Sequence, residues 1–531
     1  RTIGAWGYRI IQKNGKHFRL FCPHSACDFH LELPIQIVDE ELYLHPPTLL
    51  FATVDKFAML PWEAQIGAFF AAGTASRAPE LIIQDELHLI SGTLGTIVGL
   101  FETAIDALCS QKGIPPKIIA STATIRRAKE QCAALYNRAV VQFPPPGLNA
   151  NDSFFAKDAV IDHAHGKYGR KYVGIMPSGK TKAIIEIRLM AALLQRLFMM
   201  DLPDEVKDKL WTLTAYFNSL KELGKASTFA NDDVKDFIKR TAYRTFTWAR
   251  LMGIPDELTS RVSTTELNET LNKLEKTAYS KENITAKKYA SNVLLATNMI
   301  SVGIDVARLN VMMLLGQPKL TSEYIQASSR VGRSYPGVVF VQYDATKSRD
   351  RSHYEHFPAY HASFYRFVEP TGATPFSRPA RARALHSVVT AILRHQIGLW
   401  SDNTAIQFSR SDYADEIRAC EDFITDRVAS INALLHDHAA EDTDELREEI
   451  EYFLRRWEEA VHACKQDDPP SALYFGQKFM VKSPTDGERR LLKAYGARGT
   501  DQAFETLTSM RHVDTPVRGN VIVWEGDNTH V

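Results

Sequence analysis

The sequence carries no excess charge of either sign, since its 531 residues include 63 lysines and arginines and 63 aspartates and glutamates. This balance excludes a surface that attracts polyanions everywhere, so any nucleic-acid site must be a local groove. No apolar run approaches the roughly 18 residues that a membrane span needs, and we therefore expect none. The six cysteines are too few for a disulfide scaffold, which favours a reducing, cytoplasmic setting.

The chain also lacks an initiating methionine and a secretory signal pattern, which indicates that Arg1 lies partway through a longer protein. At roughly 150 residues per domain, its length predicts three or four parts. We place them at 1–46, an N-terminal segment; 47–143, part of a first α/β lobe; 144–370, a second α/β lobe with a polar helical insertion at about 221–288; and 371–531, a mainly helical accessory region.

Two of the cysteines lie close together near the N-terminus. Cys22 and Cys27 flank a turn, with His24 and His30 beside them. Thiolate and imidazole are the ligands that zinc prefers, and two cysteines on a tight turn supply half of a tetrahedral site. The usual signature has a second such pair, which this sequence does not show. Zn²⁺ binding and a pair of reduced surface thiols therefore both stay open.

A pair of carboxylates follows the apolar strand predicted at 81–84. Asp85 and Glu86 stand at its end, where a parallel sheet presents its ligands. Asp85 is suited to hold Mg²⁺, directly or through water, and Glu86 to orient or deprotonate an attacking water. As an alternative, both residues only cap the helix that follows. A second strand is predicted at 117–120, followed by the small hydroxyl residues of Ser121-Thr-Ala-Thr124.

A second βα segment runs from Ser291 to Arg333. It is predicted to contain strands at 293–296 and 311–315, a polar turn at 297–298 and a helix at 321–329. The helix ends in Arg330 and Arg333, whose planar guanidinium groups suit bidentate capture of phosphate oxygens. Gln326, four residues before Arg330, lies on the same helical face.

These segments resemble motifs II, III, V and VI of the superfamily 2 helicases, with DELH as the DExH form of motif II. The resemblance implies an α/β fold of two RecA-like parallel-sheet lobes that bind ATP and Mg²⁺ in the cleft between them. It implies that Asp85 holds the metal, that Glu86 is the catalytic base, and that Gln326, Arg330 and Arg333 act at the γ-phosphate.

The same resemblance assigns further contacts. Nucleotide contacts fall on His88, Gly303 and Asp305. Nucleic-acid contacts fall on Thr53, Thr122, Thr124, Asn218, Ser219, Thr297 and Asn298. Thr53 ends a buried strand predicted at 48–53, and Asn218 and Ser219 end a strand predicted at 210–219.

A phosphate-binding loop is missing where the family needs one, before Asp85. Residues 174–181 do match the GxxxxGKT pattern, with Lys180 and Thr181 in the phosphate and Mg²⁺ positions. They follow motif III, however, and Pro177 removes an amide donor from the loop. We interpret this segment as a strand-to-helix turn and expect the true loop upstream of Arg1; its absence there would restore the case for Lys180.

Several basic segments lie downstream. The mixed basic and aromatic run 347–366 fits either contact with a nucleic-acid backbone or an amphipathic helix docked on the sheet. Arg378, Arg381 and Arg383 are candidate phosphate contacts. The apolar stripe between Leu446 and Val461 predicts a helix facing a core, and the acidic run 441–451 a solvated face.

Longer phrases, such as PTLLFATVDKFAML, LIIQDELHLISGTLG and RDRSHYEHF, resemble the helicase-subunit family of the bacterial DISARM phage-defence system. This resemblance implies an ATP-dependent DNA helicase or translocase with a partner subunit that carries a domain of unknown function. The alternative is a helicase-fold nucleic-acid-binding scaffold that has lost hydrolysis. The motifs contact the backbone rather than the bases, so RNA stays open as a substrate.

Overall fold

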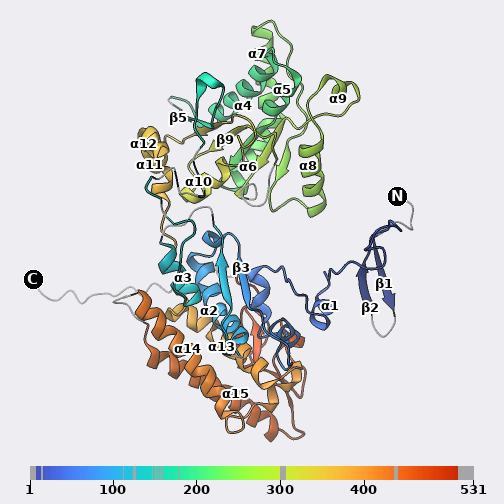
Figure 1. Cartoon of the computed structure of the whole chain (residues 1–531), viewed down its shortest axis with the longest axis vertical. Helices are drawn as coiled ribbons and strands as arrows, with labels where there is room; N and C mark the ends of the chain where they lie inside the picture. The colour runs from blue at the N-terminus through green and yellow to red at the C-terminus, as the bar shows by residue number, and fades with distance from the viewer. Residues whose placement is uncertain are drawn as a thin grey trace, which may run out of the picture. The chain divides into compact units, whose positions relative to one another are not determined.

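The computed structural model describes residues 7–511 apart from 13–15, 112, 123–126, 146, 150–151, 153–154, 156, 158, 178, 299–305 and 436–440. The chain divides into two compact units (Figure 1). The first unit combines the described residues of 7–141 with those of 371–511, and the second spans 142–370. The C-terminal region therefore folds together with the N-terminal part.

The second unit is built on one six-stranded, parallel sheet, as the α/β interpretation predicts. Its strand order is β5-β10-β9-β6-β8-β7. The strands are β5 (Lys171–Ile175), β6 (Leu213–Phe217), β7 (Asp256–Leu258), β8 (Val293–Ala296), β9 (Val311–Leu315) and β10 (Val338–Gln342). Every residue of β6 and β8 is buried, which is typical of parallel strands covered on both faces.

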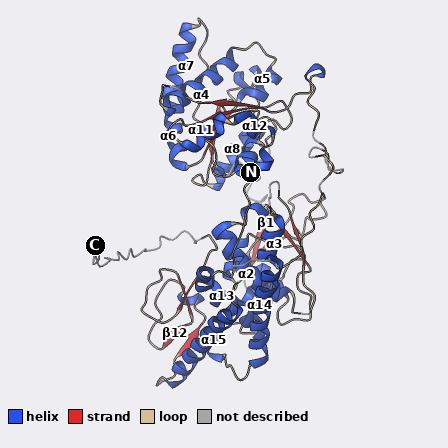
Figure 2. Ribbon diagram, turned by 90° about the vertical axis from the view of Figure 1, so that its left-hand side faces the viewer, coloured by secondary structure: helices blue, strands red, loops and turns tan. Residues whose placement is uncertain are grey.

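Helices cover both faces of this sheet (Figure 2). The helices of this unit are α4 (Lys182–Met199), α5 (Asp204–Trp211), α6 (Leu220–Asn231), α7 (Asp233–Arg244), α8 (Thr264–Lys276), α9 (Lys281–Thr285), α10 (Thr321–Ser328), α11 (Ser348–Glu355) and α12 (Phe357–Ala362), of which α9 has no buried residue. Successive residues of a strand point to opposite faces of the sheet, so alternate residues pack into two different cores. Leu213 and Ala215 pack with Met190 of α4 in one core, whereas Tyr216 packs with Tyr324 of α10 in the other.

The segment 221–288 is not the surface helical insertion that its polar composition predicts. Its residues Asp256–Leu258 form β7, which pairs in parallel with β8 at the edge of the sheet. Leu223 and Val234, on α6 and α7, are fully buried against the sheet. A three-residue polar strand offers too few residues for a period of two to be recognised.

In the first unit, the long apolar helix α2 (Gly92–Cys109) packs against α13 (Arg378–Ile397) and α3 (Ala128–Tyr136). Among the described helices, α2 is long and apolar enough to cross a membrane by length and composition, but 78% of it is buried inside the unit. It also carries Asp106, whose carboxylate accepts from the buried Arg427 at 2.6 Å. These contacts are those of a core helix.

The remaining elements of the first unit are mostly short. They are β1 (Tyr8–Gln12), β2 (Lys16–Leu20), α1 (Asp39–Leu44), β3 (Leu81–Gln84), β4 (Lys117–Ala120), α14 (Ala414–Leu435), α15 (Thr443–Gln466), β11 (Ala472–Tyr474), β12 (Glu488–Arg490), β13 (Leu492–Ala494) and β14 (Phe504–Thr506). The stripe from Leu446 to Val461 on α15 is buried as predicted.

Arg381 is not a phosphate contact. Its side chain is fully buried on α13 and pairs with Glu441, Glu445 and Glu449 at 2.7–3.0 Å. Glu445 and Glu449 are spaced four apart on one face of α15, and Glu441 lies just before the helix. The acidic run therefore neutralises a buried cation and is more than a solvated face. Arg378 also pairs with Glu445, at 2.7 Å.

The buried strand predicted at 48–53 is absent. Leu49 and Phe51 are exposed, and Thr53 precedes the 3-10 helix η1 (Val54–Met59) without capping it. An apolar run becomes a strand only where a neighbouring strand is present to pair with it. No strand among the described residues pairs with this segment.

Candidate functional site

The carboxyl ends of β3 and β4 bring the DELH segment, residues 85–88, beside Ser121 and Thr122, the first two residues of the STAT segment 121–124. The two strands pair in parallel, with Gln84 opposite Ala120, so Asp85 and Ser121 follow at the same edge. The Ser121 hydroxyl donates to Asp85 Oδ1 at 2.5 Å. The backbone N–H of Glu86 donates to the same oxygen at 2.9 Å. Two donors thus orient the Asp85 carboxylate through one of its oxygens.

Glu86 and His88 make the second link between the two segments. Glu86 has φ +50°, in the left-handed region that glutamate seldom adopts, which marks a constrained turn. Glu86 Oε2 lies 3.3 Å from His88 Nδ1. The same ring nitrogen lies 3.1 Å from Thr122 Oγ1. Glu86, His88 and Thr122 therefore form one polar chain across the strand ends.

Gln131 of α3 holds the DELH turn through hydrogen bonds to its backbone. Its side chain is fully buried, and Nε2 donates to the carbonyls of Leu87 at 3.3 Å and Ile90 at 2.7 Å. The hydroxyl of Thr371 donates to its Oε1. The sequence interpretation placed Ser121 in the STAT segment without its contact to Asp85, and it missed Gln131, because only the paired strands show which side chains lie beside Asp85.

One face of the β3–β4 pair is uncovered. Leu81 and Ile83 lie on the same face of β3, with Ile119 opposite Ile83 on β4, and all three are half-exposed or more. Parallel sheets are normally covered on both faces, as the sheet of the second unit is. The candidate site therefore stands beside a sheet face with room for further covering structure.

In the second unit, the candidate nucleic-acid residues gather at the carboxyl edge of the sheet. Asn218 and Ser219 follow β6 and are exposed, and Thr297 and Asn298 follow the neighbouring β8. The Ser219 hydroxyl accepts from the N–H of Glu222 at 3.3 Å and caps α6. Four polar residues therefore lie at one edge of two adjacent strands.

Arg330 and Arg333 lie at the opposite, amino edge of this sheet. The N–H of Gly332, between them, donates to the carbonyl of Leu309 and the side chain of Asn310, both at 3.2 Å, just before β9 begins. Gly332 has φ +73°, and a Cβ there would lie 3.0 Å from the backbone of Gly337. Only glycine fits this turn.

Two further contacts hold the arginine turn in place. Arg170 Nε donates to the carbonyl of Val331 at 2.8 Å. Arg333 Nε donates to the carbonyl of Ser329 at 3.3 Å. Gln326 is buried on α10. Gly303, Asp305 and Thr124 lie outside the described residues.

The GxxxxGKT look-alike is a turn between β5, an edge strand, and α4. The Thr181 hydroxyl caps α4 by accepting from the N–H of Ile184 at 3.4 Å. A Cβ at Gly174 would lie 2.9 Å from the ring of Phe357, so this glycine serves close packing. Ser178 lies outside the described residues.

The run 347–366 docks on the sheet. Tyr360 is buried in the core beside Tyr324, and Phe357 packs against the same cluster. His361 Nε2 lies 2.7 Å from the Tyr324 hydroxyl. Of the two alternatives for this run, the structure favours the amphipathic helices.

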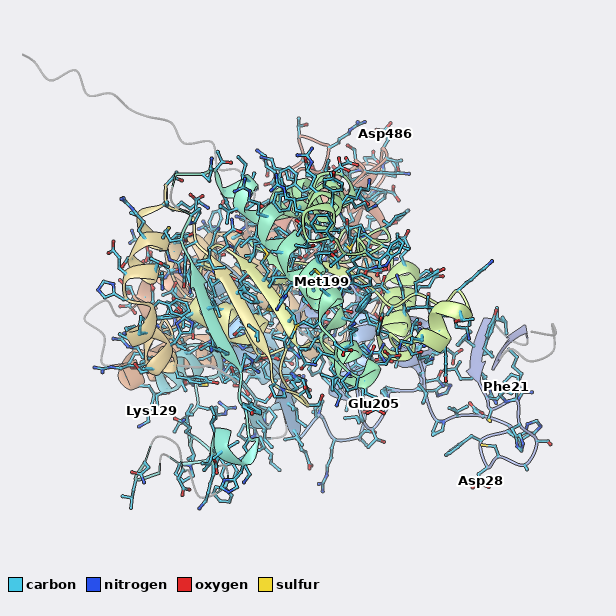
Figure 3. All side chains as sticks on the ribbon, turned by 90° about the horizontal axis from the view of Figure 1, so that it is seen from above. Phe21, Asp28, Lys129, Met199, Glu205 and Asp486 are labelled. Carbon is cyan, nitrogen blue, oxygen red and sulfur yellow. The ribbon has the colours of Figure 1, made fainter. Side chains whose placement is uncertain are left out.

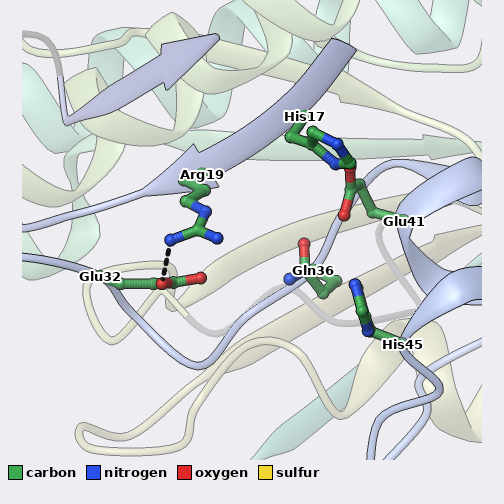
Figure 4. A pocket seen from close by; sticks show the side chains of 6 residues that line it. All are labelled: His17, Arg19, Glu32, Gln36, Glu41 and His45. Atoms are coloured by element: carbon green, nitrogen blue, oxygen red, sulfur yellow. Dashed lines mark hydrogen bonds and ion pairs between the residues drawn. The ribbon is translucent and has the colours of Figure 1, made fainter. Parts of the chain in front are cut away.

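No metal centre is visible in the N-terminal segment, because the described residues contain no group of three histidine, cysteine or carboxylate side chains that could hold an ion. Cys22 and Cys27 are free, partly exposed thiols on the turn between Phe21 and Asp28 (Figure 3). A polar cavity nearby is lined by His17, Arg19, Glu32, Gln36, Glu41 and His45 (Figure 4). Two ion pairs, His17–Glu41 at 2.6 Å and Arg19–Glu32 at 2.8 Å, occupy its walls.

Comparison with known proteins gives matches of two kinds. Residues 244–335 match the family described as Helicase conserved C-terminal domain. The chain is also 36% identical over 556 residues to the DISARM protein DrmA of Bacillus paralicheniformis, in an alignment covering 96% of this chain and 47% of DrmA. The chain thus spans about half the length of this curated relative.

Solved structures of helicases are similar at lower identity. The DUF1998 helicase MrfA bound to DNA is 16% identical with a TM-score of 0.46, covering 67% of this chain and 42% of that chain. Helicase Lhr of Mycobacterium smegmatis bound to ssDNA and AMP-PNP is 13% identical with a TM-score of 0.43, covering 75% and 40%. By its match to DrmA along nearly its whole length and by its helicase C-terminal domain, the chain is a helicase-family relative of this DISARM protein.

Proposed function

We propose that this protein is an ATP-dependent DNA helicase or translocase that acts in bacterial defence against phage. The observation that carries the proposal is the double link between DELH and STAT. Asp85 contacts Ser121, and His88 contacts both Glu86 and Thr122. A motor needs its hydrolytic carboxylate joined to a residue that senses nucleic acid, and this polar chain provides such a connection.

The residues at this edge suit Mg²⁺ and ATP. Mg²⁺ prefers carboxylate oxygen and water ligands, and Asp85 Oδ1 is already oriented by two donors. When bound, Mg²⁺ neutralises charge on the phosphates. Asp85 would hold the ion through water, and Glu86 would position and deprotonate the attacking water. Arg330 and Arg333 would supply positive charge to the transferring phosphoryl group.

The proposed ATP site also needs a phosphate-binding loop. The uncovered face of Leu81, Ile83 and Ile119 supports the view that further structure packs beside Asp85. We place the loop in that further structure, in residues outside 1–531. Lys180 is the alternative, and the cap that Thr181 makes on α4 speaks for a structural turn there.

The remaining parts of the proposal come from the relative. DrmA is named as a DISARM protein, which supports a cytoplasmic setting and a partner subunit within a defence complex. The polar strand ends at Asn218, Ser219, Thr297 and Asn298 would contact the nucleic-acid backbone. Zn²⁺ at Cys22 and Cys27 would need ligands from outside the described residues.

The test is ATP hydrolysis by the full-length protein with different nucleic acids. Single-stranded DNA, duplexes with 5′ or 3′ overhangs, and RNA are compared at equal nucleotide concentration. We expect DNA to raise the ATPase rate and RNA to raise it less. DNA binding with no ATP hydrolysis under any condition would instead support the nucleic-acid-binding scaffold.

A further inference from the structure

A cluster of exposed apolar side chains follows α7 in the second unit. Five large side chains within twelve residues are 81–96% exposed: Tyr243, Phe246, Trp248, Leu251 and Ile254. We call residues 243–254 the apolar loop. Single exposed apolar residues need no explanation, but a concentration of this kind marks an interaction site.

The backbone of the apolar loop is fixed. Gln195 of α4 donates through Nε2 to the carbonyl of Trp248 at 2.8 Å and accepts from the N–H of Arg250 at 3.0 Å. The N–H of Thr247 donates to the carbonyl of Ala242 at 3.0 Å. Phe246 has φ +52°, a left-handed conformation that aromatic residues seldom adopt. The apolar side chains are therefore held outward on an anchored backbone.

An apolar pocket of about 200 Å³ shares Arg250 with this loop. Leu194, Leu197, Trp211 and Val338 line it, and the Arg250 guanidinium stacks on Trp211 at 3.6 Å. Small-molecule sites usually span roughly 300–1,000 Å³. The pocket is smaller than that range and fits one apolar side chain of a partner.

Three arginines lie beside the loop and the pocket. Arg196 lines the pocket, and Arg240 and Arg244 lie on the last turns of α7, next to the loop. All three are exposed, and no carboxylate among the described residues pairs with them. Complementarity of charge therefore calls for an acidic occupant.

The position of the loop separates it from the candidate nucleic-acid residues. Arg250 Nε donates to Asn292, which directly precedes β8, and the pocket is lined by the first residues of β6, β9 and β10. These contacts place the loop at the amino edge of the sheet, whereas Asn218 and Thr297 follow the carboxyl ends of their strands. Leu251 and Ile254, the two exposed aliphatic side chains of the loop, and the apolar pocket also suit a protein better than stacked bases.

We propose that the apolar loop and its pocket bind an acidic, amphipathic segment of a partner protein. The segment places one apolar side chain in the pocket, packs others on Phe246, Trp248 and Leu251, and directs carboxylates to Arg240 and Arg244. The inference goes beyond the proposed ATPase and does not require hydrolysis.

The experiment crosslinks the loop in cells that make the whole protein. Phe246 is replaced by the photoreactive residue p-benzoylphenylalanine, the cells are irradiated, and the crosslinked peptide is sequenced by mass spectrometry. A synthetic fluorescent copy of that peptide is then titrated against the purified full chain. We expect a segment of another protein rich in apolar and acidic residues, and a Kd about tenfold weaker or more for Trp248→Ser and for Arg240→Glu/Arg244→Glu.

The matched control is Tyr452→Ser, which removes a half-exposed aromatic ring from α15 in the other unit and should leave the Kd unchanged. Thermal unfolding and basal ATPase show that each variant is folded and separate this test from that of the motor. Crosslinks to nucleic acid, to a second copy of this chain, to residues of the same protein outside 1–531 or to nothing would overturn the proposal. An affinity that Trp248→Ser leaves unchanged would overturn it as well.

Discussion

His88 contacts Thr122, which lies 34 residues further along the chain, and Glu86, which lies two residues before it. Its Nδ1 lies 3.1 Å from Thr122 Oγ1 and 3.3 Å from Glu86 Oε2, and the side chain is nearly fully buried. A buried ring between a carboxylate and a hydroxyl holds both at fixed distances. A shift of either partner is therefore transmitted to the other.

We predict that His88→Ala uncouples ATP hydrolysis from nucleic acid. Without the ring, a change at Thr122 no longer reaches Glu86, so DNA cannot bring this group into position, and a misplaced catalytic group costs roughly ten- to hundredfold in rate. The ratio of DNA-stimulated to basal ATPase should fall by about that factor, as measured on the full-length protein. His165→Ala, which removes an exposed ring paired with Asp162, is the control. An unchanged ratio for His88→Ala would remove the coupling role.

Glu102 on α2 makes stability depend on pH. Burial raises its pKa from 4.5 to about 7, Arg427 opposes this rise and Asp106 adds to it. The unfolded chain releases this proton near pH 4.5 and the folded chain only near pH 7, so the contribution of Glu102 to stability is lost as the pH rises between these values.

We therefore predict that Glu102→Gln flattens this part of the pH profile. The decrease in the free energy of unfolding between pH 4.5 and pH 7.5 should be smaller in the variant by up to about 3 kcal/mol. Urea unfolding of both proteins at the two pH values measures the difference. Parallel profiles would show that Glu102 ionises equally in the folded and unfolded chains.

At the scale of elements, α13 and α15 are joined by one buried cation. Arg381 has three carboxylate partners and no exposure of its side chain. We predict that Arg381→Ala destabilises the first unit by about 3 kcal/mol, because three glutamates lose their counter-charge. Arg378→Ala, at an exposed position on the same helix, should cost less than about 1 kcal/mol. Urea unfolding measures both, and equal losses would contradict this account.

The elements differ in how far the sequence predicts them. Strands β8 and β9 could be read from apolar runs that end in polar residues, because burial on both faces leaves a continuous apolar signal. Strands β3 and β4 show the same kind of run, although one of their faces is exposed. β7 could not, since it has three residues and only Leu258 is fully buried. The partners of Arg381 lie 60–68 residues away, which no local pattern reveals.

The sequence predicts individual residues of the candidate site but not the contacts that these residues make with one another. Asp85, Glu86 and His88 stand out by their place after a strand. Gln131 does not, because a glutamine on a helix is common, and the place of Ser121 after a strand does not reveal its contact with Asp85. Their roles follow from the register of β3 against β4 and from the packing of α3 beneath the DELH turn.

At the scale of the whole molecule, the chain is two units, and the C-terminal region belongs to the first. α2 packs against α13, and Arg427 of α14 reaches Asp106 of α2. Residues 371–511 therefore form part of the core around the DELH turn. The first unit carries the carboxylates that we propose to be hydrolytic, and the second carries the arginines and the polar strand ends, so the proposed activity needs both.

The measurement that tests the central claim most directly is ATP turnover by the full-length Glu86→Gln variant in the presence of single-stranded DNA. We predict that turnover falls by a factor of about a thousand or more while DNA affinity is kept, because the amide cannot accept a proton from water. Glu80→Gln, at an exposed position that pairs with Arg77, should hydrolyse ATP like the wild type. Undiminished hydrolysis by Glu86→Gln would contradict the assignment of the DELH turn as the hydrolytic site.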